Sequence, residues 1–381
     1  MSSVLQVREL RKRPSLTQIL LVVFLMCCSL YNTQIFWLRI IITGLIPIIP
    51  ILLAVIQPSM RLRKSIFHYM FASILWSGYF VFWVIMQAPQ LELNLSGANV
   101  EMLTPALFVS SVLALPVIAN VSPSTLKNAI KIFFSLLLAT LLLDILFRWY
   151  LEPECFLNYT CRKPAKTVGF FSTTNALATS FVPIVLSVAA INQLPLGKRI
   201  LALLVLISTM ARAALVSYFL VGSFGRALKI NGLRKWFFIL FLTCIIVALF
   251  HFDPFSFRGD GSGSSKIDFF AGTISLASSM DSVDIIFGVG ASFDAVTEAL
   301  GVNGWSPHAP ILKAFLYFGM CGLALYVYSI FGVLKLHEKM WLPLASFVLL
   351  SLAGAPIFFP TFFACFAILR SADPIWGADR A

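Results

Sequence analysis

The chain has 381 residues, of which 59% are hydrophobic and 12% charged, and its mean hydropathy is +0.92. Soluble domains carry about a quarter charged residues, so this composition excludes a soluble protein and predicts an all-α, polytopic membrane protein with one membrane domain over residues 1–381. The net charge of +12 does not indicate binding to nucleic acid, because most Lys and Arg lie in short loops, where they orient helices.

Twelve apolar segments follow one another along the chain and predict about twelve transmembrane helices. The basic segment before them, residues 1–15, lacks a small-residue cleavage site after the first apolar run, so we expect a cytoplasmic tail rather than a signal peptide. The apolar runs lie at 17–34, 36–57, 66–87, 103–120, 126–150, 169–193, 200–211, 213–225, 236–252, 310–334, 341–354 and 356–369.

Two pairs of residues in the middle of the chain have predicted local roles. Asp144 and Arg148 lie four residues apart in the fifth run, where we expect a structural ion pair. Cys155 and Cys161 share the polar loop after it, and could form a disulfide if that loop faces an oxidising compartment. Cysteine spacings typical of zinc sites are missing, so we expect no zinc site. We also expect no cofactor.

Arg212 interrupts the apolar stretch 200–225 and leaves two topologies open. A single span would bury Arg212 in mid-membrane, at a cost of about 2.5–3.5 kcal/mol on insertion scales. Alternatively, two short helices meet at Arg212 near the outer face. This second topology puts most Lys and Arg on the cytoplasmic side, whereas the single span divides them almost evenly. The positive-inside rule therefore favours two helices, both termini in the cytoplasm, and the segment 253–309 outside.

The segment 253–309 is the longest polar part of the chain and forms a large predicted periplasmic loop. Within it, residues 264–280 (SSKIDFFAGTISLASSM) predict an amphipathic helix on the membrane surface. Arg258 lies near the start of the loop and could either be solvated or bind an anion. Lys266 and Asp260 are weaker candidates for substrate contacts, and Asp260 or Asp268 could also serve as a carboxylate base.

His308 ends the loop and precedes a helix that Ser306 and Pro310 are suited to begin. The helix dipole disfavours imidazolium at this position and keeps a histidine neutral and able to act as a base. A histidine held only by loop hydrogen bonds is the alternative. Gly319 and Gly322 in the helix indicate close packing against a neighbour.

Two further residues at predicted outer ends of helices could contact a substrate. Arg212 carries a permanent positive charge, and its guanidinium can donate two parallel hydrogen bonds to phosphate oxygens. Alternatively, Arg212 could fix the turn of a helix hairpin. Asn175 begins the sixth span and could bind a sugar or cap a helix.

Several of these features occur in an order that resembles the O-antigen polymerase and O-antigen ligase superfamily. They are GFFSTTNALA, the STMARAAL turn, a long outer loop beginning near an arginine and holding FGVG (287–290), and His308 with its step to Gly319. The similarity covers about 165–330, and the earlier part matches only as hydrophobic spans. The sequence departs from the family pattern at Ala309, where Asn is common.

The resemblance implies a metal-independent glycosyltransferase of the GT-C type that acts at the periplasmic face of a bacterial inner membrane. Its donor would be a glycan on undecaprenyl pyrophosphate. By the family pattern, Arg212 and Arg258 would hold the pyrophosphate, and His308 would activate or orient the acceptor hydroxyl. Expected partners are the lipid bilayer, a chain-length regulator and a flippase.

Three functional readings stay open from the sequence. A polymerase, which joins lipid-linked repeat units, is the leading one. A ligase would transfer the glycan onto lipid A–core by the same apparatus. A transporter or flippase of lipid-linked glycan would show charges or broken helices at mid-membrane in paired positions.

Overall fold

The computed structural model describes residues 14–31, 33, 35–57, 63–87, 104–151, 174–191, 195–208, 212–227, 264–289, 310–351 and 360–372. All elements in these ranges are helices, as the composition predicts. Eleven of the twelve predicted apolar runs coincide with helices, and the ninth run, 236–252, lies outside the described residues. These helices are α2 (Leu16–Leu30), α3 (Phe36–Ile56), α4 (Lys64–Gln87), α5 (Thr104–Asn120), α6 (Pro123–Leu151), α7 (Thr174–Ile191), α8 (Leu196–Ser208), α9 (Arg212–Ala227), α14 (Pro310–Leu336), α15 (Trp341–Ser351) and α16 (Thr361–Ser371).

Two more helices lie in the predicted polar loop, α11 (Ser264–Ser279) and α12 (Ser282–Phe287). α11 covers the segment that the sequence predicts as a helix. α12 begins where the Asp281 side chain accepts a hydrogen bond from the Asp284 backbone N–H, at 2.8 Å. It ends at Gly288, whose φ of 89° only glycine adopts readily.

Four of the described helices are long and apolar enough to cross a membrane: Trp37–Ile56, Lys64–Trp83, Pro123–Phe147 and Pro310–Leu336. Their outward faces are also apolar. On α3, Trp37 is 71% exposed and Val55 is 75% exposed. Large apolar side chains on the outside of a helix are expected where lipid, rather than water, is the solvent. The chain is therefore an all-helical, multi-pass membrane protein by length and composition.

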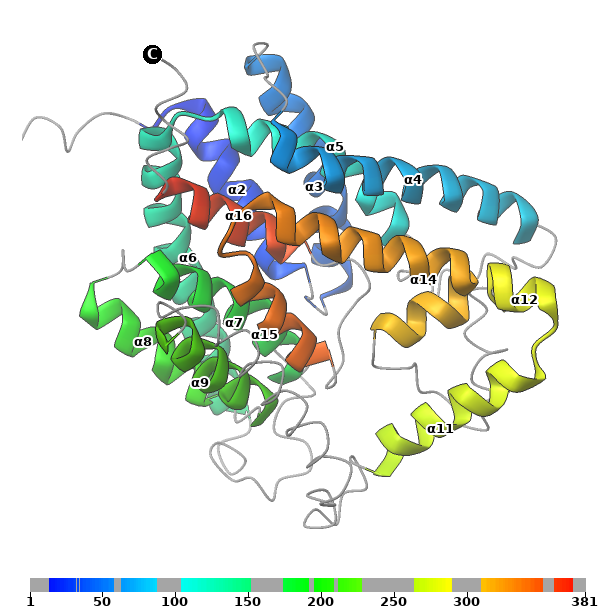
Figure 1. Ribbon diagram of the computed structural model, residues 1–381. Coiled ribbons are helices and arrows are strands. Elements are labelled where there is room, and N and C mark those ends of the chain that lie inside the picture. Colours follow the sequence, from blue (N-terminus) through cyan, green and yellow to red (C-terminus); the bar gives the residue numbers. More distant parts are fainter. Residues whose placement is uncertain are drawn as a thin grey trace, which may run out of the picture.

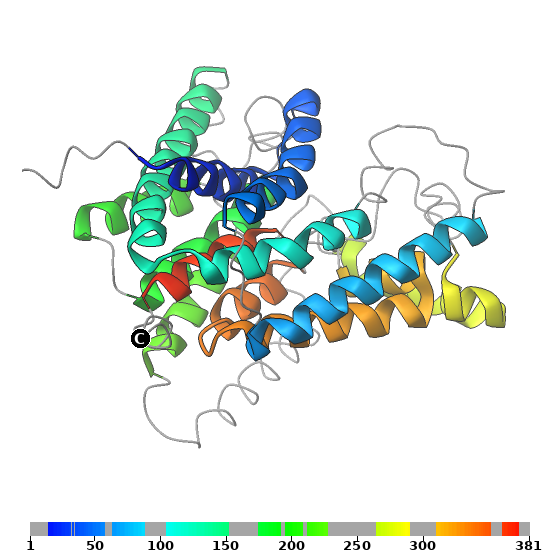
Figure 2. The same cartoon turned by 90° about the horizontal axis from the view of Figure 1, so that it is seen from above.

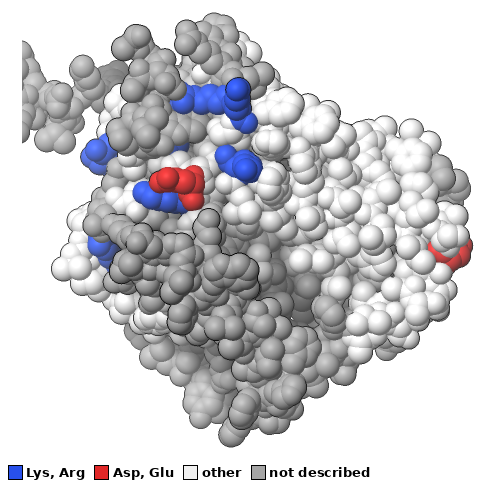
Figure 3. All heavy atoms as spheres, viewed as in Figure 1, with Lys and Arg blue, Asp and Glu red and all other residues white. Residues whose placement is uncertain are grey.

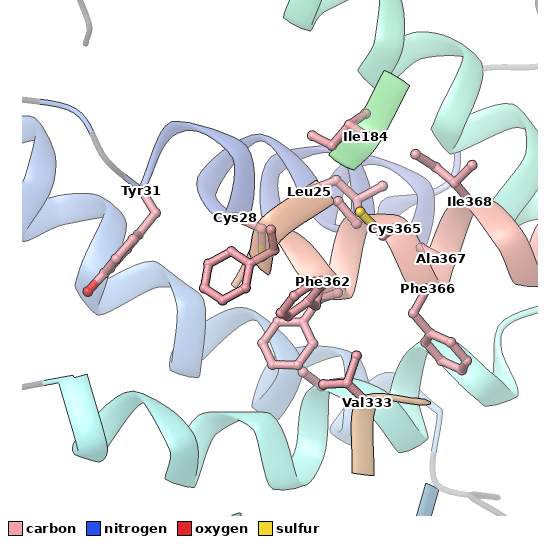
Figure 4. Packing of buried hydrophobic residues seen from close by; sticks show 14 of the residues in the cluster. Leu25, Cys28, Tyr31, Ile184, Val333, Phe362, Cys365, Phe366, Ala367 and Ile368 are labelled. Carbon is pink, nitrogen blue, oxygen red and sulfur yellow. The ribbon is translucent and has the colours of Figure 1, made fainter. Parts of the chain in front are cut away.

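The short helix α16 forms the centre of the core. Every residue from Thr361 to Arg370 is buried, so this helix is covered on all sides by others, as expected for one that is apolar all round. Figure 4 shows side chains of α2, α7 and α14 surrounding it near Phe362 and Cys365. Ring contacts extend this packing, with Phe363 stacked on Phe24 of α2 and Phe362 edge-on to Phe347 of α15.

α4 and α14 lie side by side and antiparallel along their length (Figures 1 and 2). Near the start of α4, the backbone of Tyr69 passes so close to Gly332 that a Cβ there would meet it at 2.9 Å. Near the other end, Trp83 contacts Tyr317. The two basic termini, Lys64 of α4 and Lys335 of α14, therefore lie at the same end of the pair.

Candidate functional site

The predicted site residues fall mostly at the N-terminal ends of helices or just before them. Arg212 is the first described residue of α9, and α8 ends at Ser208. Residues 209–211 lie outside the described residues, so the predicted turn between two helices stays a prediction. Asn175 is the second residue of α7 and Lys266 the third of α11, but for Arg212, Asn175 and Lys266 only the backbone is described. His308 lies two residues before Pro310, where α14 begins.

The other predicted residues fall in parts of the chain that the structure does not describe. His308 itself, Arg258, Asp260, Cys155 and Cys161 lie outside the described residues, as does the side chain of Arg148, the predicted partner of Asp144. Asp144 is buried, with 1% exposure. The proximity of His308, Arg212 and Arg258 and the proposed disulfide therefore stay predictions.

The helix that follows His308 is broken at Gly319. The sequence places Gly319 inside a continuous helix, and this is wrong, because its φ of 66° and ψ of −164° are not helical. That region of backbone space is essentially restricted to glycine. α14 therefore consists of a first half, Pro310–Phe318, and a second half that follows Gly319.

The break is occupied by the end of α12. A Cβ on Gly319 would lie 2.2 Å from the carbonyl oxygen of Ile286, and a Cβ on Gly288 would lie 2.3 Å from that of Tyr317. The two glycines thus let two backbones touch directly, which is the close packing that the sequence predicts for Gly319. A side chain at Gly322 would also be incompatible with the break, because a Cβ there would lie 2.1 Å from the Cβ of Phe318 in its own helix.

Three carbonyl groups before the break accept hydrogen bonds from outside the helix. The last carbonyls of a helix lack intrahelical partners, and a buried one left without a donor is costly. Leu316 O accepts from the Val289 backbone N–H at 2.9 Å. Tyr317 O accepts from Trp83 Nε1 at 3.1 Å, and Phe318 O accepts from the Tyr79 hydroxyl at 2.6 Å.

Aromatic rings enclose this region. The Phe318 ring contacts Trp83, with centroids 5.0 Å apart, and meets Trp76 edge-on at 5.5 Å. The ring of Phe287, the last residue of α12, lies 5.5 Å from that of Phe82 on α4. The end of α12, within the predicted loop, is thereby packed against both α4 and α14, at the end opposite Lys64 and Lys335.

Lys313 is a further candidate that sequence reasoning did not select. It lies in the first half of α14 and only 5% of its surface is exposed. Its sequence signal is weak, since ILKAF looks like a lysine at a membrane boundary. A buried lysine and the N-terminal end of a helix dipole both stabilise negative charge, so this position suits an anionic substrate.

The start of α12 is acidic, with Asp281 as its N-cap and Asp284 in its first turn. Partial burial, and secondarily the neighbouring Asp281 carboxylate, raise the pKa of Asp284 above its ordinary value. Figure 3 shows the described basic side chains gathered on the part of the visible face away from α12, with one acidic group among them and another at the opposite edge. Within the described ranges, no cluster of three or more His, Cys, Asp or Glu side chains could hold a metal ion.

Two basic side chains outside the candidate site join neighbouring helices. Lys198, at the start of α8, donates a hydrogen bond from Nζ to Ser135 Oγ of α6, at 2.7 Å, one turn after Lys131. Arg370, at the end of α16, donates from its guanidinium to Ile118 O and Val121 O at the end of α5.

No protein-family model and no curated protein matches this chain. The likeness to the O-antigen polymerase and ligase superfamily therefore rests on the ordered motifs in the sequence.

Proposed function

We propose that this chain is a polysaccharide polymerase of the O-antigen type, a metal-independent membrane glycosyltransferase. It would transfer a growing glycan from undecaprenyl pyrophosphate onto a lipid-linked repeat unit. The observation that best supports this is the direct packing of Gly288 on Gly319. It ties the FGVG segment of the polar loop to the helix that follows His308, two features that the sequence links only by their order.

The antiparallel α4–α14 pair supports a periplasmic site. Lys64 and Lys335 lie at one end of this pair, and α12 lies at the other. The positive-inside rule assigns the lysine end to the cytoplasm, which assigns α12 and the loop to the periplasm. This agrees with the proposed twelve spans of a bacterial inner-membrane protein with both termini in the cytoplasm.

The proposed reaction needs cations and one group that handles a proton. The acceptor hydroxyl oxygen attacks the anomeric carbon of the donor glycan, the bond from that carbon to the pyrophosphate breaks, and undecaprenyl pyrophosphate leaves with the electron pair. Arg212 and Arg258 would stabilise the charge that develops on the diphosphate. His308, kept neutral before the N-terminus of α14, would take the hydroxyl proton, unless Asp260 does so.

Substrate contacts would come from the remaining candidates. Asn175 would bind a sugar hydroxyl, and Lys266 would add positive charge at the loop. Lys313 would add to the positive field at the start of α14. Each lies on a helix at or near its N-terminal end, where the dipole also favours an anion.

A transporter or flippase of lipid-linked glycan is the second candidate, because broken helices are typical of transporter substrate sites and α14 is broken. A deletion strain separates the readings. Loss of a polymerase leaves a single repeat unit on lipid A–core. Loss of a ligase leaves unmodified core while lipid-linked polymer accumulates, and loss of a flippase leaves unmodified core with single lipid-linked units in the cytoplasmic leaflet.

We expect His308→Ala and Arg212→Ala each to abolish long glycan chains while the protein still inserts normally, because each removes a group that acts on the reacting atoms. Lipopolysaccharide on a gel gives the chain length, and an immunoblot of membranes gives the protein level. His68→Ala and Arg199→Ala, which change the same residue types elsewhere, should keep normal chains. Normal chain length in both site variants would show that the assigned site is wrong.

A further inference from the structure

We propose that Tyr79 and Trp83 of α4 are positioning residues that hold the first half of α14 in its working orientation. This inference rests on the proposed function, because it assigns these residues a part in the transfer reaction. Neither residue would touch the substrate. Both act on the half-helix Pro310–Phe318, which starts two residues after His308 and carries Lys313.

The argument begins with the freedom that the break creates. A continuous helix fixes the direction of its first turns through its own hydrogen bonds, but at Gly319 the backbone leaves the helical conformation. The direction of Pro310–Phe318 must then be set by contacts from other elements. The carbonyls of Tyr317 and Phe318 are the points nearest the break where such contacts are made.

Those contacts come from two neighbouring turns of one rigid helix. Tyr79 and Trp83 are four residues apart on α4, so their side chains lie on the same face. The Tyr79 hydroxyl donates to Phe318 O at 2.6 Å, and Trp83 Nε1 donates to Tyr317 O at 3.1 Å. Two donors on one face fix both the position and the rotation of the half-helix end.

The third contact ties the orientation of the half-helix to the polar loop. Val289 N–H donates to Leu316 O at 2.9 Å from the segment that follows α12. The half-helix is therefore held between α4 on one side and the polar loop on the other. We call Tyr79, Trp83 and Val289 the carbonyl clamp.

The clamp has a chemical consequence at the start of α14. A tilt of the half-helix about Gly319 would move its N-terminus most, since that end is farthest from the pivot. Misplacement of a catalytic group by about 1 Å can cost on the order of a hundredfold in rate. Loss of a clamp donor should therefore lower kcat and leave the KM for the lipid-linked substrate nearly unchanged.

The test uses Tyr79→Phe and Trp83→Phe, which remove a donor and keep an aromatic ring. Tyr328→Phe is the matched control, because it removes a hydroxyl from the same helix pair, far from the break, where the contact to His68 Nδ1 is long at 3.5 Å. Two quantities are measured on the purified protein. One is the polymerisation rate with lipid-linked repeat units, giving kcat and KM. The other is the alkylation rate of Cys321, two residues after the break and partly buried, resolved by mass spectrometry.

We expect Tyr79→Phe to lower kcat about tenfold, to leave KM within about twofold, and to raise the alkylation rate of Cys321, while Tyr328→Phe changes none of these. Unchanged kcat and unchanged Cys321 reactivity in both Tyr79→Phe and Trp83→Phe would overturn the inference. If neither variant nor the unaltered protein polymerises the substrate, the proposed function fails. Faster Cys321 alkylation in Tyr79→Phe alone would then still support the structural part of the clamp.

Discussion

Gly319→Ala is expected to abolish long glycan chains and to reduce the amount of folded protein in the membrane. The φ of 66° with ψ near −164° costs an alanine about 1–3 kcal/mol in backbone strain. The added Cβ would also lie 2.2 Å from the carbonyl oxygen of Ile286, which belongs to rigid backbone and cannot rotate away. The variant must therefore expel α12 from the break or distort α14. Chain length on a gel and the monodisperse fraction in detergent measure both effects.

The matched control for this variant is Gly78→Ala. Gly78 lies in α4, which packs against α14, but nothing lies within 4 Å of the Cβ that alanine would add there. An alanine in a helix interior is favoured over glycine, so this change should be neutral or stabilising by up to about 1 kcal/mol. If Gly319→Ala behaved like Gly78→Ala, the backbone packing at the break would have no role in folding or in activity.

Arg370→Ala is expected to destabilise the fold by about 3 kcal/mol, among the largest effects available to one side chain outside the proposed site. Arg370 has 2% exposure, and its guanidinium donates to Ile118 O and to Val121 O, the latter at 2.7 Å. These carbonyls end α5, where a cation also matches the negative end of the helix dipole. Truncation would leave both carbonyls buried without this donor. Fluorescence-detected gel filtration after heating measures the loss.

Two comparisons make the Arg370 result specific. Arg199→Ala removes an arginine that is exposed, and surface charges contribute about 0–1 kcal/mol, so its unfolding temperature should stay near that of the unaltered protein. Arg370→Lys keeps the charge but not the fork that reaches two carbonyls, so it should fall between the two. Equal thermal stability of Arg370→Ala and Arg199→Ala would contradict the helix-capping role.

Much of the helical framework could be predicted from the sequence, because apolar runs in a membrane protein become helices whatever their neighbours are. The predicted turn at Arg212 adjoins residues 209–211, which lie outside the described residues, so it stays a prediction. α11 was predictable from SSKIDFFAGTISLASSM. In each case the information is local to the segment that forms the helix.

The features that depend on contacts between distant segments could not be predicted. The residues around Gly319 are typical of a continuous helix. The break at Gly319 depends on contact with the backbone around Gly288, which lies thirty-one positions earlier in the chain. Lys313 and Arg370 look like ordinary boundary charges until α14 and α16 are packed. The clamp donors Tyr79 and Trp83 sit in an aromatic run of α4 where nothing local distinguishes them from lipid-facing rings.

The most direct test of the proposed polymerase uses the purified protein with lipid-linked repeat units as the only glycan. We predict a ladder of polymers on undecaprenyl pyrophosphate, formed in the presence of a chelator, without lipid A–core, and with one undecaprenyl pyrophosphate released for each bond made. The His308→Ala protein, present at the same level and equally monodisperse, should form no ladder. Transfer that occurs only when lipid A–core is added, or no transfer with either acceptor, would contradict the proposed polymerase.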